Sequence, residues 1–193
     1  MNKPRIYVDT SVYGGVFDKE FQKPSVRFFE QVRKGVFRLV TSGIVQREVD
    51  LAPTQVAKFF DDFLENTEMI PTSAEALVLR KAYLDAKIVS QKYSDDALHV
   101  ALATFSSCQI IVSWNFKHIV HYDKIDLYNA VNVMNGYSRL AICTPAEVIK
   151  YECAKVSWCK RTGKQIQSGQ RLATRPALNF TQVAATKPVE LKG

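Results

Sequence analysis

Short apolar runs alternate with helical patterns along the first 150 residues. Ile6–Val8 and Ile110–Val112 contain no charged residue and are rich in β-branched side chains. Runs of this kind are typical of strands that are covered on both faces of a parallel sheet. Residues 94–105 carry apolar side chains on nearly every side, which predicts a buried helix. The order of strands and helices therefore predicts an α/β fold with a mostly parallel central sheet.

The remaining elements are predicted from the same periodicities and from capping signals. We expect further strands at 37–41, 69–71 and 140–143, and further helices at 25–35, 42–49, from Pro53, at 72–86, near 126–135 and from Pro145. Ser42 and Ser94 are suitable N-cap residues. Two pairs have capping-box spacing, namely Thr72 with Glu75 and Thr144 with Glu147.

Length, composition and charge predict one domain with an extension. The chain has 193 residues, of which 47% are hydrophobic, enough for one core. Periodicity fades after about residue 150, so we place a domain at 1–150 and a tail at 151–193. The domain holds 18 Lys and Arg against 17 Asp and Glu, whereas the tail holds 8 against 2. The basic tail is either a solvated, poorly ordered segment or an extension that attracts phosphate backbones.

No segment of the sequence indicates a membrane protein or a secreted one. No apolar run approaches the roughly 20 residues that a membrane span needs, and the N-terminus shows no signal-peptide pattern. The four cysteines lack CxxC spacing, which favours reduced thiols. We therefore predict a cytoplasmic protein without a membrane partner.

Several polar residues follow predicted strands or open predicted helices, where an α/β sheet places its ligand site. Asp9 ends the first strand, and Asn115 follows the strand at 110–112. Glu48 lies on the helix after the second strand, and Asp95 and Asp96 open the buried helix. Acids at a helix N-terminus are also stabilised by the helix dipole, and Glu48 alone fits a surface position. Asp9 is the hardest to explain structurally, because it comes directly from an apolar strand.

Clustered carboxylates repel one another unless a cation lies among them. Carboxylate and water ligands favour hard divalent ions such as Mg²⁺ or Mn²⁺. Such a cluster would serve phosphoryl chemistry, in which a metal ion activates water and neutralises developing charge. His99 lies three residues after Asp96 on the same helix face. It either lines this site or is a packed helix histidine, and we favour the second interpretation.

The sequence resembles the PIN-domain ribonucleases, a family that includes the toxins of bacterial toxin–antitoxin pairs. The matching segments occur in the family's order between residues 5 and about 120: Tyr7–Ser11, Arg47–Glu48, Asp96–Ala101 and Val112–Phe116. The resemblance implies a three-layer α/β/α fold and Mg²⁺- or Mn²⁺-dependent cleavage of RNA.

The same resemblance assigns roles to individual residues. It implies that Asp9, Glu48 and Asp96 bind the metal, that Thr10 or Ser11 hydrogen-bonds within the site, and that Asp95 assists. Asn115 stands where many members have a fourth acid. An amide can position a water or coordinate through its oxygen, but it adds no charge, so a second ion would be held more weakly.

The implied partners are RNA, a small antitoxin protein and a second copy of the chain in a homodimer, and no residue of the sequence establishes either of the last two. Two other functions stay open. The first is a degenerate, non-catalytic PIN-like domain that binds RNA or a protein. The second is a different α/β hydrolase or phosphatase that acts on a small phosphate ester.

Overall fold

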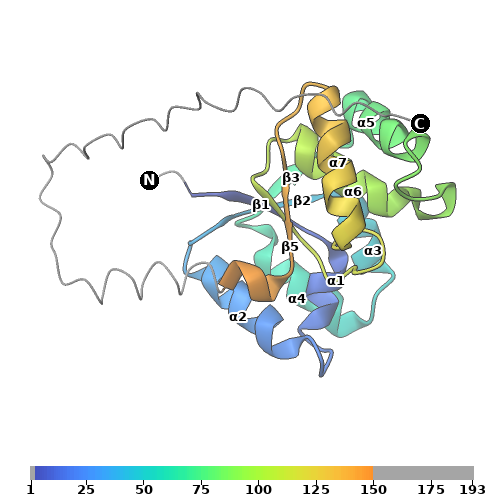
Figure 1. Cartoon of the computed structure of the whole chain (residues 1–193). Coiled ribbons are helices and arrows are strands. Elements are labelled where there is room, and N and C mark those ends of the chain that lie inside the picture. The colour runs from blue at the N-terminus through green and yellow to red at the C-terminus, as the bar shows by residue number, and fades with distance from the viewer. Residues whose placement is uncertain (1–2, 150–193) are drawn as a thin grey trace, which may run out of the picture.

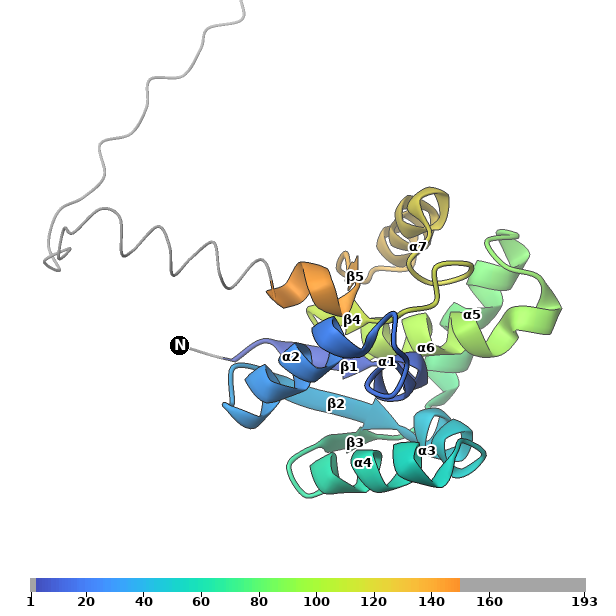
Figure 2. The ribbon, with the colours of Figure 1, turned by 90° about the horizontal axis from the view of Figure 1, so that it is seen from below.

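The central element is a five-stranded sheet in which every neighbouring pair of strands is parallel. A computed structural model describes residues 3–149 (Figure 1). The strands are β1 (Arg5–Val8), β2 (Arg38–Ser42), β3 (Glu68–Ile70), β4 (Ile110–Val112) and β5 (Ala141–Cys143). Their order is β3-β2-β1-β4-β5, and Figure 2 shows them stepping in this order across the molecule. The predicted α/β class with a parallel sheet is confirmed.

Helices cover both faces of the sheet and give the three-layer α/β/α arrangement that the family resemblance implied (Figure 1). Helices α1, α2 and α4 lie on one side, and α5, α6 and α7 pack together on the other. Helix α3 follows β2 and contacts α1 and α4. The bounds are α1 (Thr10–Gly15), α2 (Gln22–Arg33), α3 (Gly43–Asp50), α4 (Thr54–Leu64), α5 (Ala74–Asp85), α6 (Ser94–Phe105) and α7 (Tyr122–Met134).

The core lies where the apolar runs predicted it. Residues 6–8 of β1 and 111–112 of β4 are fully buried, because helices cover both faces of these strands. Eight consecutive residues of α6, Ala97–Thr104, are also buried. A helix that is buried all round needs apolar side chains on every side, as the sequence predicted. This burial fixes the position of α6 against the sheet and therefore the position of its acidic first turn.

Two predicted helix starts and one predicted N-cap differ from the structure by one to three residues. Helix α5 is capped by Ser73, whose Oγ accepts from the backbone N–H of Ala76, and not by Thr72. Helix α6 begins at Ser94 itself, because the short 3-10 helix η1 (Gln91–Tyr93) runs directly into it. Helix α2 begins at Gln22, ahead of the expected start at residue 25.

One further helix start and two further predicted caps can be compared with the structure. Helix α7 begins at Tyr122, four residues before the expected start. The capping box of Thr144 and Glu147 is confirmed, since the backbone N–H of Thr144 donates to Glu147 Oε2 (2.7 Å) and that of Glu147 donates to Thr144 Oγ1 (3.4 Å). Ser42 precedes α3 as predicted, but its hydroxyl makes no cap. That hydroxyl has a different partner, which belongs to the site described below.

The described part of the chain ends at residue 149, so the predicted tail at 151–193 lies outside it. Between residues 3 and 149, none of the helices combines the length and the apolar character needed to cross a lipid bilayer. Cys108 and Cys143 are free thiols.

Candidate metal centre

Strand order reverses at β1, which has β2 on one side and β4 on the other. In parallel sheets such a switch point opens a crevice at the carboxyl ends of the strands, because the following connections turn away in opposite directions. Asp9 directly follows β1, Ser113 directly follows β4, and α3 follows β2 with Glu48 on it. The topology therefore brings these three polar segments together at one edge of the sheet.

Asp9 is 95% buried and its carboxylate is held by hydroxyl groups. Its Oδ2 accepts hydrogen bonds from Ser11 Oγ (2.5 Å) and Ser113 Oγ (2.6 Å). Its Oδ1 lies 3.7 Å from His99 Nε2. Two neutral donors on one oxygen leave the negative charge in place and leave Oδ1 directed at the rest of the site.

The segment after β4 is locked against the segment after β1. The backbone N–H of Trp114 donates to Ser11 Oγ (2.9 Å), and its indole N–H donates to Ser25 Oγ (2.9 Å). The indole lies so close to Gly15 that a Cβ there would come within 2.8 Å of Nε1. Gly15 therefore allows the close approach that keeps Ser113 beside Asp9.

Glu48 projects from α3 toward the same point. Its carboxylate accepts a hydrogen bond from the hydroxyl of Thr10. Its Oε2 and Oε1 lie 3.2 Å and 3.3 Å from His99 Nε2. The Glu48 side chain is 37% exposed, so it forms the solvent-facing side of a site whose other members are buried.

His99 is buried at the centre of this arrangement. Its Nδ1 lies 2.9 Å from the hydroxyl of Tyr7, which lies 2.7 Å from Ser42 Oγ. A hydroxyl both donates and accepts, so this chain can serve either tautomer of the imidazole. With Tyr7 donating to Nδ1, Nε2 carries a proton toward Glu48. With Nδ1 donating to Tyr7, Nε2 presents a lone pair.

Asp9, Glu48 and His99 form the group of ligand atoms that fits one metal ion. One atom from each lies within 4.8 Å of the others. Asp96, the third acid expected from the sequence, is not a member of this group. Our preference for His99 as an ordinary packing residue does not account for its two carboxylate contacts. Its position three residues after Asp96 was the signal that indicated the site.

Asp96 lies beside the group and is oriented by Asn115. Asn115 Nδ2 donates to Asp96 Oδ1 (2.8 Å), while Asn115 Oδ1 accepts from the backbone N–H of His118 (2.9 Å). A backbone N–H can only donate, so the amide oxygen must face His118 and the amide nitrogen must face Asp96. The visible role of Asn115 is thus to position a carboxylate. Asp95 is exposed and makes no hydrogen bond to these residues.

The charges of the site perturb one another strongly. Burial, and after it the carboxylate of Asp9, raise the pKa of Asp96 to about 6. Burial alone would lower the pKa of His99, but its hydrogen bond to Glu48 and the charges of Asp9, Glu48 and Asp96 raise it. Burial alone would raise the pKa of Glu48. The hydrogen bond and the charge of His99 lower it, and so does the hydrogen bond from Thr10. His99 therefore acts as the counter-charge of the acids.

The donor set fits a divalent cation. Two carboxylates supply hard oxygen atoms, and a buried imidazole supplies a nitrogen whose second ring atom is held by Tyr7, a common arrangement for metal-binding histidines. Oxygen ligands suit Mg²⁺ and Mn²⁺, and imidazole suits transition metals. Perturbed carboxylates grouped with a histidine at a sheet switch point also mark a candidate catalytic site.

An open hollow of about 470 Å³ lies beside Glu48. It lies between α3, α5 and α6, and its lining includes Glu48, Asp95, Arg47 and Arg80. A larger hollow of about 640 Å³ lies near the amino ends of β1 and β2, with Lys3 and Arg38 in its lining. That hollow lies at the opposite end of the strands from Asp9 and Glu48, whereas the smaller one is lined by Glu48 itself.

Solved structures share this fold at low sequence identity. Residues covering 73% of this chain match 95% of a chain in the structure of FitAB bound to an IR36 DNA fragment, with a TM-score of 0.50 and 13% identity. A chain of VapBC2 from Rickettsia felis, solved bound to a DNA fragment from the promoter, matches over 72% of this chain and 98% of its own, with a TM-score of 0.47 and 17% identity. No family model matches the chain, and no curated protein matches it in sequence. The likeness to the FitAB chain confirms the fold that the resemblance to PIN domains implied.

Proposed function

We propose that the protein is a metal-dependent endoribonuclease that hydrolyses RNA phosphodiester bonds. The observation that supports this most directly is the convergence of Asp9, Glu48 and His99 beside Asp96, at the switch point of a PIN-like sheet. The family resemblance supplies the substrate class. A bound Mg²⁺ or Mn²⁺ supplies Lewis acidity for phosphodiester hydrolysis.

Each side chain would have a defined task. Asp9 and Glu48 would hold the ion, with His99 Nε2 as a nitrogen ligand and Asp96 as the additional carboxylate. Ser11, Ser113 and Thr10 fix the acids by hydrogen bonds. Asn115 holds Asp96 in place. Because the pKa of Asp96 is near neutral, this carboxylate is suited to accept the proton of an attacking water.

A nuclease assay on the full chain tests the proposal. We expect end-labelled RNA to be cleaved with millimolar Mg²⁺ or Mn²⁺ and to stay intact with EDTA. Asp9→Asn, purified in the same way, should lose cleavage by at least about a thousandfold while keeping its fold. Cleavage by Asp9→Asn at the wild-type rate would contradict the proposal and indicate a contaminating nuclease.

The same assay separates the other two functions. A degenerate PIN-like domain would bind RNA without cleaving it at any metal concentration. A phosphatase would hydrolyse p-nitrophenyl phosphate, which an endoribonuclease of this type should leave intact. The family resemblance also leads us to propose a small antitoxin partner and a homodimer. Co-purification with the product of a neighbouring short reading frame would test the first, and light scattering would test the second.

A further inference from the structure

We call Asp9, Glu48, Asp96 and His99 the acidic centre. Basic side chains gather next to it, around the ring of Tyr93. The ammonium groups of Lys92 and Lys117 lie 5.6 Å and 5.5 Å from the centroid of this ring. His118 stacks on the same ring with a centroid distance of 3.8 Å, and Lys124 Nζ lies 3.2 Å from His118 Nδ1. We call Lys92, Tyr93, Lys117, His118 and Lys124 the basic patch.

The charges of the basic patch have no counter-ions within the described residues. Between residues 3 and 149, no carboxylate oxygen lies within 4 Å of the ammonium groups of Lys92, Lys117 or Lys124. Burial lowers the pKa of His118, and Lys124, Lys117 and His121 lower it further. Every charge that acts on this imidazole is positive. Like charges held this close repel one another unless an anion binds among them.

His118 adds a hydrogen-bond donor to the basic patch. An ammonium group can only donate, so His118 Nδ1 must accept from Lys124 and the proton of the neutral ring must sit on Nε2. His118 is 92% buried, and its Nε2 has no partner within the described residues. A buried N–H without an acceptor is costly, at about 1–3 kcal/mol. The patch thus combines three cations that have no carboxylate oxygen within 4 Å and one buried N–H that has no acceptor among the described residues.

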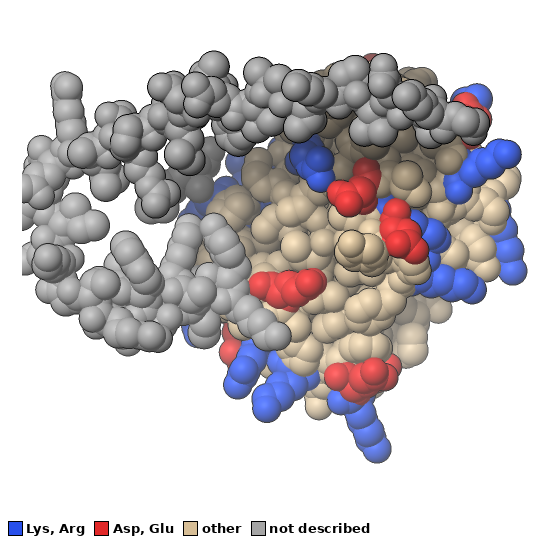
Figure 3. Space-filling view, in the orientation of Figure 1, with Lys and Arg blue, Asp and Glu red and all other residues tan. Residues whose placement is uncertain are grey.

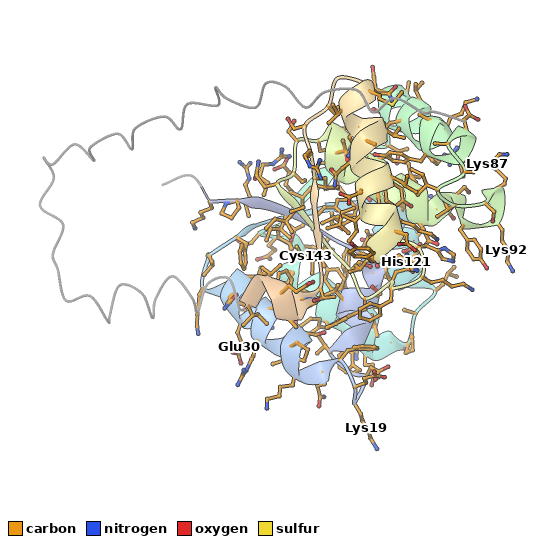
Figure 4. The ribbon with its side chains drawn as sticks, in the orientation of Figure 1. Lys19, Glu30, Lys87, Lys92, His121 and Cys143 are labelled. Atoms are coloured by element: carbon orange, nitrogen blue, oxygen red, sulfur yellow. The ribbon has the colours of Figure 1, made fainter. Side chains whose placement is uncertain are left out.

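The basic patch adjoins the acidic centre through one residue. Asn115 Oδ1 accepts from the backbone N–H of His118, and Asn115 Nδ2 donates to Asp96. Tyr93 directly precedes α6, the helix that carries Asp96 and His99. Figure 4 labels Lys92 on the short helix η1 before α6 and His121 near the start of α7. In Figure 3, basic side chains gather along the right-hand margin, the side on which Lys92 lies.

We propose that the basic patch binds the phosphate backbone of single-stranded RNA and guides the strand into the acidic centre. This inference rests on the proposed function and names the surface that would hold its substrate. The acids repel phosphates, so a strand that reaches them needs cations close by on its path. Contacts to phosphates carry no sequence information, so this surface would set affinity and position, and not the cleavage sequence.

The test is the salt dependence of RNA binding by the full chain. Fluorescence anisotropy with a labelled, unstructured oligonucleotide would be measured in the Asp9→Asn background, which prevents turnover. The patch variant is Lys92→Gln, Lys117→Gln and Lys124→Gln together. The matched control is Lys19→Gln, Lys23→Gln and Lys58→Gln, three exposed lysines elsewhere that remove the same charge. Both proteins keep the basic tail, whose contribution therefore cancels.

Each phosphate contact contributes about 0.7 to the slope of log K against log salt for a single strand. The patch variant should therefore lower this slope by about 2 and weaken binding roughly a hundredfold near 0.1 M salt, while the control changes neither. Lys124 also donates to the backbone oxygen of Lys117, so the Lys92→Gln, Lys117→Gln double variant guards against a folding defect. It should lower the slope by about 1.4.

The outcomes are distinct. An unchanged slope in a folded patch variant overturns the inference even if the wild-type protein cleaves RNA. Equal losses in the patch and control variants also overturn it, because they indicate a general charge effect. A wild-type chain that binds RNA through the basic patch but cleaves none would overturn the proposed function and leave this inference standing.

Discussion

Asn115 joins the acidic centre to the basic patch, but the two regions differ in whether their charged groups have partners within the protein. In the acidic centre, the carboxylates of Asp9 and Glu48 have partners from hydroxyl groups and from His99. In the basic patch, the lysines lie around Tyr93 and His118, and no carboxylate oxygen of residues 3–149 lies within 4 Å of their ammonium groups. The acidic centre can hold a cation, and its carboxylates also have hydrogen-bond partners within the protein when no cation is bound. The basic patch is organised to attract an anion from outside.

Adding metal should give the largest difference between the two regions, because only the acidic centre should bind the ion and raise the Tm. An ion at a hundredfold excess over its Kd stabilises the folded state by about 2.7 kcal/mol, or about 5–11 °C in Tm for a domain of this size. Mn²⁺ should give this shift in the wild type and in the Lys92→Gln, Lys117→Gln variant. Asp9→Asn should give none, and an equal shift in all three proteins would show that the ion binds elsewhere.

Removing the imidazole should weaken binding of Mn²⁺ more than binding of Mg²⁺. A nitrogen ligand favours transition metals over Mg²⁺, so His99→Gln is expected to raise the Kd for Mn²⁺ by at least about tenfold and to change that for Mg²⁺ less. Calorimetric titration of both ions measures the two constants. Equal losses for the two ions would mean that His99 only orients the carboxylates.

The smallest expected effect concerns the strain among the acids in metal-free protein. The folded-state pKa of Asp96 is about 6, above its ordinary value of 3.8. Stability linked to its protonation is present below pH 4 and is lost as pH rises through 6. Asp96→Asn keeps an oxygen for Asn115 and removes this loss. After a discount for solvent screening, we expect a gain on the order of 1 kcal/mol at pH 7–8 in EDTA.

That gain should be absent below pH 4, where the wild-type carboxyl is protonated in both states. Thermal denaturation across this range measures it, with Asp123→Asn, an exposed acid on α7, as the control. A gain that is the same at every pH would show that burial and the neighbouring charges do not raise the pKa of Asp96.

Much of the fold follows from local sequence, because strands that are buried on both faces need continuous apolar runs, which are visible in the sequence. The apolar runs at 6–8 and 110–112 predicted the centre of the sheet, and the apolar helix at 94–105 predicted α6. The helix starts were less predictable, because Thr72 and Ser73 are both good caps and only the packing of α5 selects between them.

The composition of the acidic centre was harder to predict than its location. Asp9 and Glu48 converge because both follow neighbouring parallel strands. The role of His99 depends on Tyr7, whose hydroxyl lies inside an otherwise apolar strand, and on Ser42, which serves Tyr7 where a helix cap was expected. These contacts join residues separated by 35 and 92 positions, so no local pattern reveals them. The basic patch could not be predicted from the sequence for the same reason, because its lysines come from two separate segments.

The central claim is that Asp9, Glu48 and His99 together bind one divalent ion. The most direct measurement is a Mn²⁺ titration followed by electron paramagnetic resonance, in which free Mn²⁺ gives the signal. We predict saturable loss of this signal with the wild-type protein, and little loss with Asp9→Asn or with Glu48→Gln. Equal binding of Mn²⁺ by all three proteins would contradict the claim.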